Sequence, residues 1–131
     1  MTQTNSVTAI IGKDTYQTKI IAGNHSLIAD EPDSLGGKDQ GPDAGDFLRM
    51  SLATCTAITL RMYINRKEWS VNEIRVHVSY LKEKDKTIFT RSIDVDGDVD
   101  DEQRKRLLSI ANACPIHKTL TNPIEINTTL T

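Results

Sequence analysis

One uninterrupted stretch, residues 46–67, limits most strongly what this chain can fold into. It has no proline or glycine, and its apolar side chains cover most of the circumference of a helix: Phe47, Leu48, Met50, Leu52, Ala53, Ala57, Ile58, Leu60, Met62 and Ile64. A helix that is apolar on nearly all sides is buried in a core or against a partner chain. Asp43 is the predicted N-cap, and Asp46 follows three residues later in a variant of the capping box.

Shorter patterns predict the other elements. Alternation indicates strands at residues 7–13, 16–22, 26–30, 71–82, 87–95 and 124–128. Asp100 and Gln103 form a second capping box, and Pro115 begins a short helix that ends at Leu120. The predicted order is βββ–α–ββ–α–(short α)–β. Because strands and helices are segregated, we predict one α+β domain over residues 1–131, with antiparallel sheets around the long buried helix. Only one other full helix can cover that helix, so we expect a homodimer.

Composition narrows the class of function. Sixteen Lys and Arg against eighteen Asp and Glu leave a net charge of −2, which argues against a nucleic-acid partner bound by bulk charge. Charged residues interrupt the longest apolar stretch, so we expect no membrane span. Residues 1–6 lack the segments of a secretory leader, and we therefore expect a cytoplasmic location. Two cysteines are too few for a disulfide scaffold, which leaves buried thiols, metal ligands or redox-active thiols.

The two cysteines have different predicted surroundings. Cys55 lies in the middle of the long helix, in a mostly apolar pocket, and position alone favours a small core residue. Cys114 lies where one helix ends and Pro115 opens the next. We expect its sulfur near free backbone N–H groups, which favour the thiolate, and a packing role is the alternative. The two residues fit a peroxidatic and a resolving thiol, although 59 positions separate them in the sequence.

Zinc binding is the competing chemistry. Cys114 and His117 have the spacing of a ligand pair, and Cys55, His25 or His77 are the further ligands available. No second closely spaced pair exists, so this hypothesis is the weaker one.

Several segments together resemble the osmotically inducible and organic-hydroperoxide-resistance (OsmC/Ohr) family, and its OsmC-like branch in particular. The segments that carry the resemblance are residues 29–32, 36–42, 53–63, 102–104 and 110–120. The resemblance spans nearly the whole chain, and the contexts of both cysteines are its most specific part.

The resemblance implies an α+β fold in which two chains intertwine into a homodimer, with two active sites at the interface. It implies that Cys55 is the peroxidatic thiol and Cys114 the resolving thiol. It further implies that organic hydroperoxides are the substrates and that a dithiol, such as a lipoylated protein, is the reductant, with no cofactor.

Two positions depart from the family pattern. Well-characterised members pair the reactive thiol with an arginine and a glutamate, but residues 1–48 contain no arginine. Lys19 or Lys38 can replace the charge, but a lysine lacks the bidentate fork of arginine. Gly45 stands at the position of the glutamate, and Asp46 is the nearest acid. Helical geometry turns Asp46 away from the reactive cysteine, so capping is its competing role.

Two principal hypotheses follow. The first is a peroxidase for organic hydroperoxides, with Cys55 as nucleophile, Cys114 as resolver, and Asp46 and Lys38 as supporting candidates. The second is a non-catalytic OsmC-like dimer that binds a small apolar ligand at the subunit interface, with the cysteines retained for packing.

Overall fold

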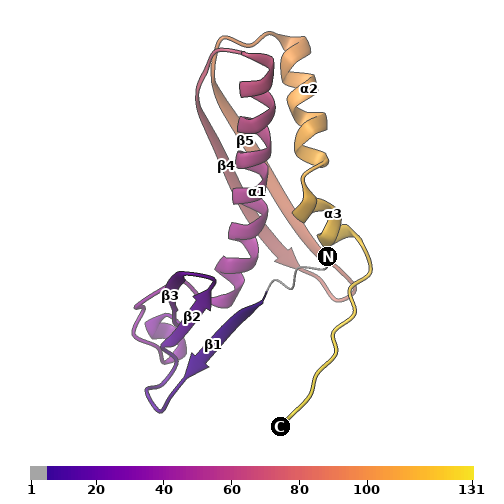
Figure 1. The fold of residues 1–131 in the computed structure, drawn as a ribbon. Helices are drawn as coiled ribbons and strands as arrows, with labels where there is room; N and C mark the ends of the chain where they lie inside the picture. The colour runs from indigo at the N-terminus through magenta and orange to yellow at the C-terminus, as the bar shows by residue number, and fades with distance from the viewer. Residues whose placement is uncertain (1–5) are drawn as a thin grey trace. The chain divides into compact units, whose positions relative to one another are not determined.

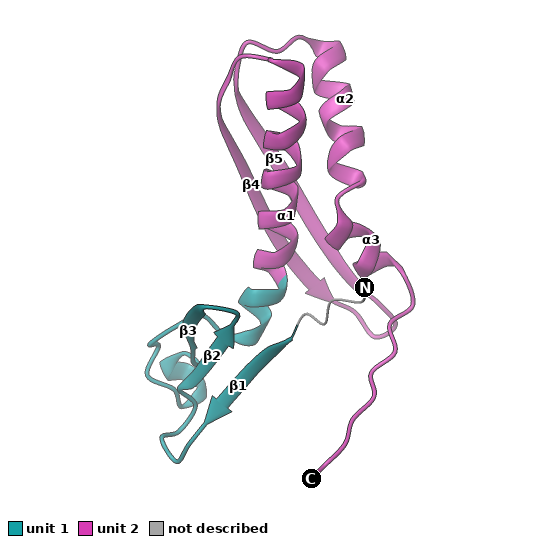
Figure 2. Ribbon diagram, in the orientation of Figure 1, with its two compact units in different colours: residues 1–48 teal, residues 49–131 magenta. Residues whose placement is uncertain are grey.

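The computed structural model describes residues 6–131, which form two compact units (Figure 2). Unit 1 comprises residues 1–48 and unit 2 comprises residues 49–131. The expectation about a leader concerns residues 1–6 and lies, apart from Ser6, outside the described residues. The prediction of one domain over the whole chain stays a prediction.

Unit 1 contains a three-stranded antiparallel meander, as predicted from the early alternating runs (Figure 1). Its strands pair in the order β1 (Val7–Ile11), β2 (Thr18–Ala22), β3 (His25–Ala29). Ala22 pairs with His25 across a two-residue turn. Gly23 takes a left-handed φ of 60° at the first position of this turn, a conformation that a residue without a side chain adopts at little cost.

A glycine-rich loop connects the meander to the long helix, and the carboxylate of Asp30 organises it. Asp30 is 4% exposed and accepts hydrogen bonds from the backbone N–H groups of Glu31 at 2.7 Å, Gln40 at 3.2 Å and Lys38 at 3.4 Å. Burial raises the pKa of Asp30, but these hydrogen bonds and the charge of Lys38 outweigh it and hold the pKa below its ordinary value.

Unit 2 packs helices against one face of a long hairpin (Figure 1). The hairpin consists of β4 (Val71–Lys82) and β5 (Thr87–Gly97), which confirms the predicted pair. Helix α1 (Ala44–Lys67) and helix α2 (Asp101–Asn112) supply the buried cluster of Leu60, Tyr63, Ile64, Leu107 and Ala111. Removing a leucine or isoleucine side chain from water contributes about 1.5–3 kcal/mol, so this cluster stabilises unit 2.

Both predicted capping boxes are present. The backbone N–H of Asp46 donates to Asp43 at 2.7 Å, and the backbone N–H of Asp43 donates to Asp46 at 3.1 Å. At the start of α2, Asp100 and Gln103 exchange the same two hydrogen bonds, each 2.8 Å long. Each box satisfies two backbone donors that a helix start leaves unpaired, which explains why the starts were predictable.

The structure corrects one expectation. The predicted last strand, residues 124–128, is absent, and Ile124 and Ile126 are 62% and 82% exposed. A strand requires a ladder of hydrogen bonds to a neighbouring strand, and this segment pairs with none in the described chain. The expectation for helix α1 is burial in a core or against a partner chain. Within this chain α1 is buried along one stripe, while Met50, Ile58 and Met62 are 38%, 50% and 65% exposed, and burial against a partner stays a prediction. Across residues 6–131, no helix has the length and apolar character that crossing a bilayer requires.

Candidate active site

The two cysteines lie close together in unit 2, from opposite ends of its sequence. Cys55 is in the middle of α1 and is partly exposed, whereas Cys114 is fully buried at the N-cap of α3 (Pro115–Thr121). The Cys55 thiol is near enough to the Cys114 sulfur to help lower the pKa of Cys114, and both residues are free thiols. The fold therefore brings together the two sulfurs that the sequence separates.

Cys114 receives several hydrogen bonds at its sulfur. The backbone N–H of His117 donates to Sγ at 3.4 Å, and Thr56 Oγ1 lies 4.0 Å from Sγ. Burial raises the pKa of the Cys114 thiol, but donors on His117, Cys55, Thr56 and Ile116 outweigh this effect. The pKa of Cys114 therefore lies below its ordinary value, and the predicted placement of its sulfur near free N–H groups is confirmed.

Cys55 is bounded by two threonines of its own helix. Its sulfur lies 3.9 Å from Oγ1 of Thr59, one turn later. Thr56 is fully buried, and its hydroxyl donates to the backbone carbonyl of Leu52 at 2.7 Å. A hydroxyl has one proton to donate, and Thr56 donates it to Leu52. The Oγ1 of Thr56 is therefore available as an acceptor for other donors.

Arg91 on β5 brings a guanidinium to this site. Nη1 donates to Thr56 Oγ1 at 3.0 Å, and Nη2 donates to Asn112 Oδ1 at 2.9 Å and to His117 Nδ1 at 3.1 Å. A guanidinium can only donate, so Nδ1 of His117 accepts, and we assign the ring proton to Nε2 on this ground. These three partners carry no negative charge.

Sequence reasoning missed Arg91, although the pattern of β5 contains the signal. Side chains alternate between the two faces of a strand, and Arg91 is on the same partly buried face as Phe89, Ile93 and Val95. A charged residue on an inward face requires polar partners inside the protein. The register of the hairpin places Arg91 opposite Val78, another residue of the inward face.

The other charged candidates have separate contacts. Asp46 caps the start of α1, and Lys38 lies in the loop around Asp30, both in unit 1. Of the two arginines six residues from Cys55, Arg61 donates to the backbone carbonyl of Val71 at 3.1 Å and Arg49 lies over the ring of Tyr80. The structure therefore gives Asp46 a capping contact, and its chemical role and that of Lys38 stay predictions.

The zinc hypothesis loses support at His117. Its Nδ1 faces the guanidinium of Arg91 at 3.1 Å, and a positive group in that position opposes a cation. His77 lies on the exposed face of β4. Within residues 6–131, no group of three or more His, Cys, Asp or Glu side chains is arranged to hold a metal ion.

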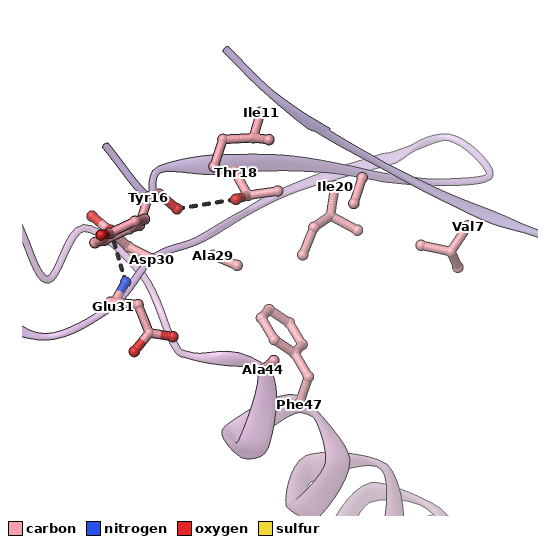
Figure 3. Close-up of a pocket in the computed structure, with 11 residues that line it drawn as sticks. Val7, Ile11, Tyr16, Thr18, Ile20, Ala29, Asp30, Glu31, Ala44 and Phe47 are labelled. Atoms are coloured by element: carbon pink, nitrogen blue, oxygen red, sulfur yellow. Dashed lines mark hydrogen bonds between the residues drawn. The ribbon is translucent and has the colours of Figure 1, made fainter. Parts of the chain in front are cut away.

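Unit 1 contains an apolar hollow of about 530 Å³ (Figure 3). One face of the meander forms its wall, and the start of α1 closes it with Ala44 and Phe47. Asp30, Glu31 and Tyr16 bring polar groups to one end, as the sticks in Figure 3 show. The hollow suits a small apolar molecule, because such sites are mostly apolar with a few polar groups.

Comparison with known proteins identifies relatives of this arrangement. Residues 37–129, well over half of the chain, match the family model described as OsmC-like protein. No curated protein matches.

Solved structures share the fold over nearly the whole chain. An OsmC-like protein from Mycoplasma pneumoniae superposes with a TM-score of 0.77 at 17% identity, covering 92% of this chain and 89% of that one. The organic hydroperoxide resistance protein OhrB of Bacillus subtilis gives 0.63 at 22% identity, covering 91% of each chain. An organic hydroperoxide resistance protein OsmC from Legionella pneumophila gives 0.63 at 17%, covering 91% and 90%. At these identities, the likeness establishes the mixed α+β fold.

Proposed function

Because the chain belongs to the OsmC-like protein family, we propose that it is a thiol-dependent peroxidase that reduces organic hydroperoxides. Cys55 and Cys114 cycle between two thiols and a disulfide. The observation that supports this most strongly is the proximity of the two thiols in unit 2: Oγ1 of Thr56, the residue after Cys55, lies 4.0 Å from the sulfur of Cys114. The names of the similar proteins from Bacillus subtilis and Legionella pneumophila, both organic hydroperoxide resistance proteins, point to the same substrate class.

Oxidation begins at Cys55. Its thiolate attacks one oxygen of the O–O bond, so that an S–O bond forms and the alcohol leaves with one proton. The sulfur loses two electrons and becomes a sulfenic acid. We assign this step to Cys55 because it is partly exposed, whereas Cys114 is 0% exposed and hard for a peroxide to reach.

Cys114 is suited to the second step. Its thiolate attacks the Cys55 sulfur, the S–S bond forms, and the hydroxyl leaves as water after taking a proton. The lowered pKa of Cys114 keeps more of it in the reactive thiolate form. The lowered pKa also makes Cys114 the better leaving group. A dithiol, such as a lipoylated protein, attacks the sulfur of Cys55 and releases the Cys114 thiolate. The second thiol of the dithiol then releases Cys55, and the dithiol ends as a disulfide.

We further propose that the chain works as a homodimer. Met50, Ile58 and Met62 form an exposed apolar stripe on α1. Exposed apolar patches often mark surfaces that contact a partner chain. Asp46 and Lys38 remain our candidates for additional charged groups of the site.

The test is a titration of the reduced protein with one equivalent of an alkyl hydroperoxide, followed by mass spectrometry of intact protein. We expect the wild type to lose two hydrogens as the disulfide forms. Cys114→Ser should stop at the sulfenic acid, which dimedone traps, and Cys55→Ser should consume no peroxide. Two thiols that stay reduced in the wild type, or a Cys55→Ser protein that still consumes peroxide, contradict the proposal.

The hollow in unit 1 supports the second hypothesis, binding of a small apolar molecule without catalysis. An apolar fluorescent probe, 1-anilinonaphthalene-8-sulfonate, is expected to bind there. Ala44→Trp fills the end of the hollow beside Phe47 and should reduce that binding. If the probe binds and peroxide leaves both thiols unchanged, binding is the better description of the protein.

A further inference from the structure

Arg91 lies on a partly buried face of its strand. It lies on the inward face of β5 between Phe89 and Ile93, and that face packs against the helices of unit 2. Desolvating a guanidinium there destabilises the fold unless polar partners replace the lost water. All three of its hydrogen-bond partners belong to the segments around the two cysteines.

The three contacts tie those segments together. Thr56 directly follows Cys55 on α1, and Asn112 ends α2 two residues before Cys114. His117 lies three residues after Cys114, and its backbone N–H is the donor that caps the cysteine sulfur. One guanidinium therefore connects the residue after one thiol to both sides of the other.

We propose that Arg91 is the positioning residue of the thiol pair, which holds the α1 turn of Cys55 against the α2–α3 junction of Cys114. Its effect on turnover rests on the proposed function above. Its effect on the geometry of the two sulfurs does not, because any two-electron oxidant that joins the thiols depends on the same geometry.

The planar guanidinium of arginine matches the three acceptors at this position. Nη1 bonds the threonine, while the two protons of Nη2 go to the amide of Asn112 and the imidazole of His117. A lysine ammonium keeps the charge but does not present donors in this fixed planar spread. The backbone N–H of His117 donates to the Cys114 sulfur, so loosening His117 weakens a hydrogen bond that stabilises its thiolate.

The consequence for the disulfide is geometric. A disulfide forms only when the two Cα atoms are within about 7 Å and the Cβ atoms face each other. A tie between α1 and the α2–α3 junction favours the approach of the two thiols. Without the tie, the sulfurs meet less often, and closure slows for any oxidant.

The experiment compares Arg91→Gln and Arg91→Lys with Arg75→Gln, an exposed arginine of the same hairpin that pairs with Glu73. The first measurement is thiolate absorbance against pH in a Cys55→Ser background, where the serine hydroxyl keeps a donor near Cys114. The second is the rate at which diamide, an azo compound that is reduced to the hydrazine, closes the disulfide in proteins with both cysteines.

We expect Arg91→Gln to raise the titration midpoint of Cys114 by about one pH unit and to slow closure by diamide about tenfold. Arg91→Lys should recover less than half of each loss. Arg75→Gln should leave both unchanged. Unchanged values for Arg91→Gln overturn the proposal. Full recovery by Arg91→Lys also overturns it, because charge alone would then explain the role.

A second pair of variants covers the case in which Arg91→Gln does not fold. In His117→Asn, the side-chain oxygen replaces Nδ1 as acceptor, whereas His117→Ala has no acceptor. We expect the asparagine variant to keep the wild-type midpoint and closure rate and the alanine variant to lose them. Equal behaviour of the two variants overturns the proposal. Normal closure by diamide without any reaction with peroxide would refute the peroxidase function and leave the role of Arg91 standing.

Discussion

Unit 1 and unit 2 differ in how well they bury their apolar residues. In unit 2, Leu60 and Ile64 are 0% exposed, and two helices and a hairpin enclose them. In unit 1, all of β1 is exposed, and Val7 and Ile10 are 65% and 51% exposed. The contrast teaches that unit 2 completes its own core and holds the thiol pair with its own residues, whereas the meander of unit 1 leaves an apolar face open.

The same substitution in the two units should give the largest contrast in stability. Leu60→Ala leaves a cavity in a closed core and should lower the free energy of unfolding by about 2–5 kcal/mol. Leu27→Ala, at a position that is 46% exposed on β3, should cost at most about 1 kcal/mol. Urea denaturation followed by circular dichroism measures both. Equal costs would mean that the open face of unit 1 is covered in solution.

Within unit 1, we expect substitutions in the loop around Asp30 to lower stability the most. A Cβ at Gly37 would overlap the backbone carbonyl of Glu31, so Gly37→Ala should lower the free energy of unfolding by about 1–3 kcal/mol. Gly12→Ala is the matched control, because nothing lies within 4 Å of a Cβ there. Thermal melts of the two variants compare them. A Gly37→Ala protein as stable as the control would show that the loop packs less tightly than described.

The smallest effect is a pH dependence from Asp30. Its folded pKa lies below the ordinary value of 3.8, so its charge stabilises the fold above that value. This contribution is lost as the pH falls through the folded pKa. The stability difference between wild type and Asp30→Asn should therefore be constant above about pH 5 and shrink toward about pH 3. Urea midpoints across this range test the sign, and a difference that grows on acidification would contradict it.

Helix caps and strand alternation could be predicted from the sequence because they depend on neighbouring residues. Capping boxes at Asp43 and Asp100 and the alternation of the β4–β5 hairpin depend on residues a few positions apart. The expected thiolate surroundings of Cys114 likewise follow from Pro115 opening a helix right after it. The predicted strand at residues 124–128 failed because a strand depends on a partner that no local pattern supplies.

The sequence by itself determined the order of the strands and of the three α-helices up to α3 and the starts of α1 and α2. It also determined that Cys55 lies within a helix and Cys114 at the start of one. Only the tertiary structure decided that Cys55 and Cys114 lie near each other and that Arg91 reaches both of their segments. Helix and turn signals act over one or two turns of chain, so they can be read in order. The juxtaposition of residues 55, 91 and 114 arises from packing helices on a hairpin, and no spacing along the chain encodes the distance between them.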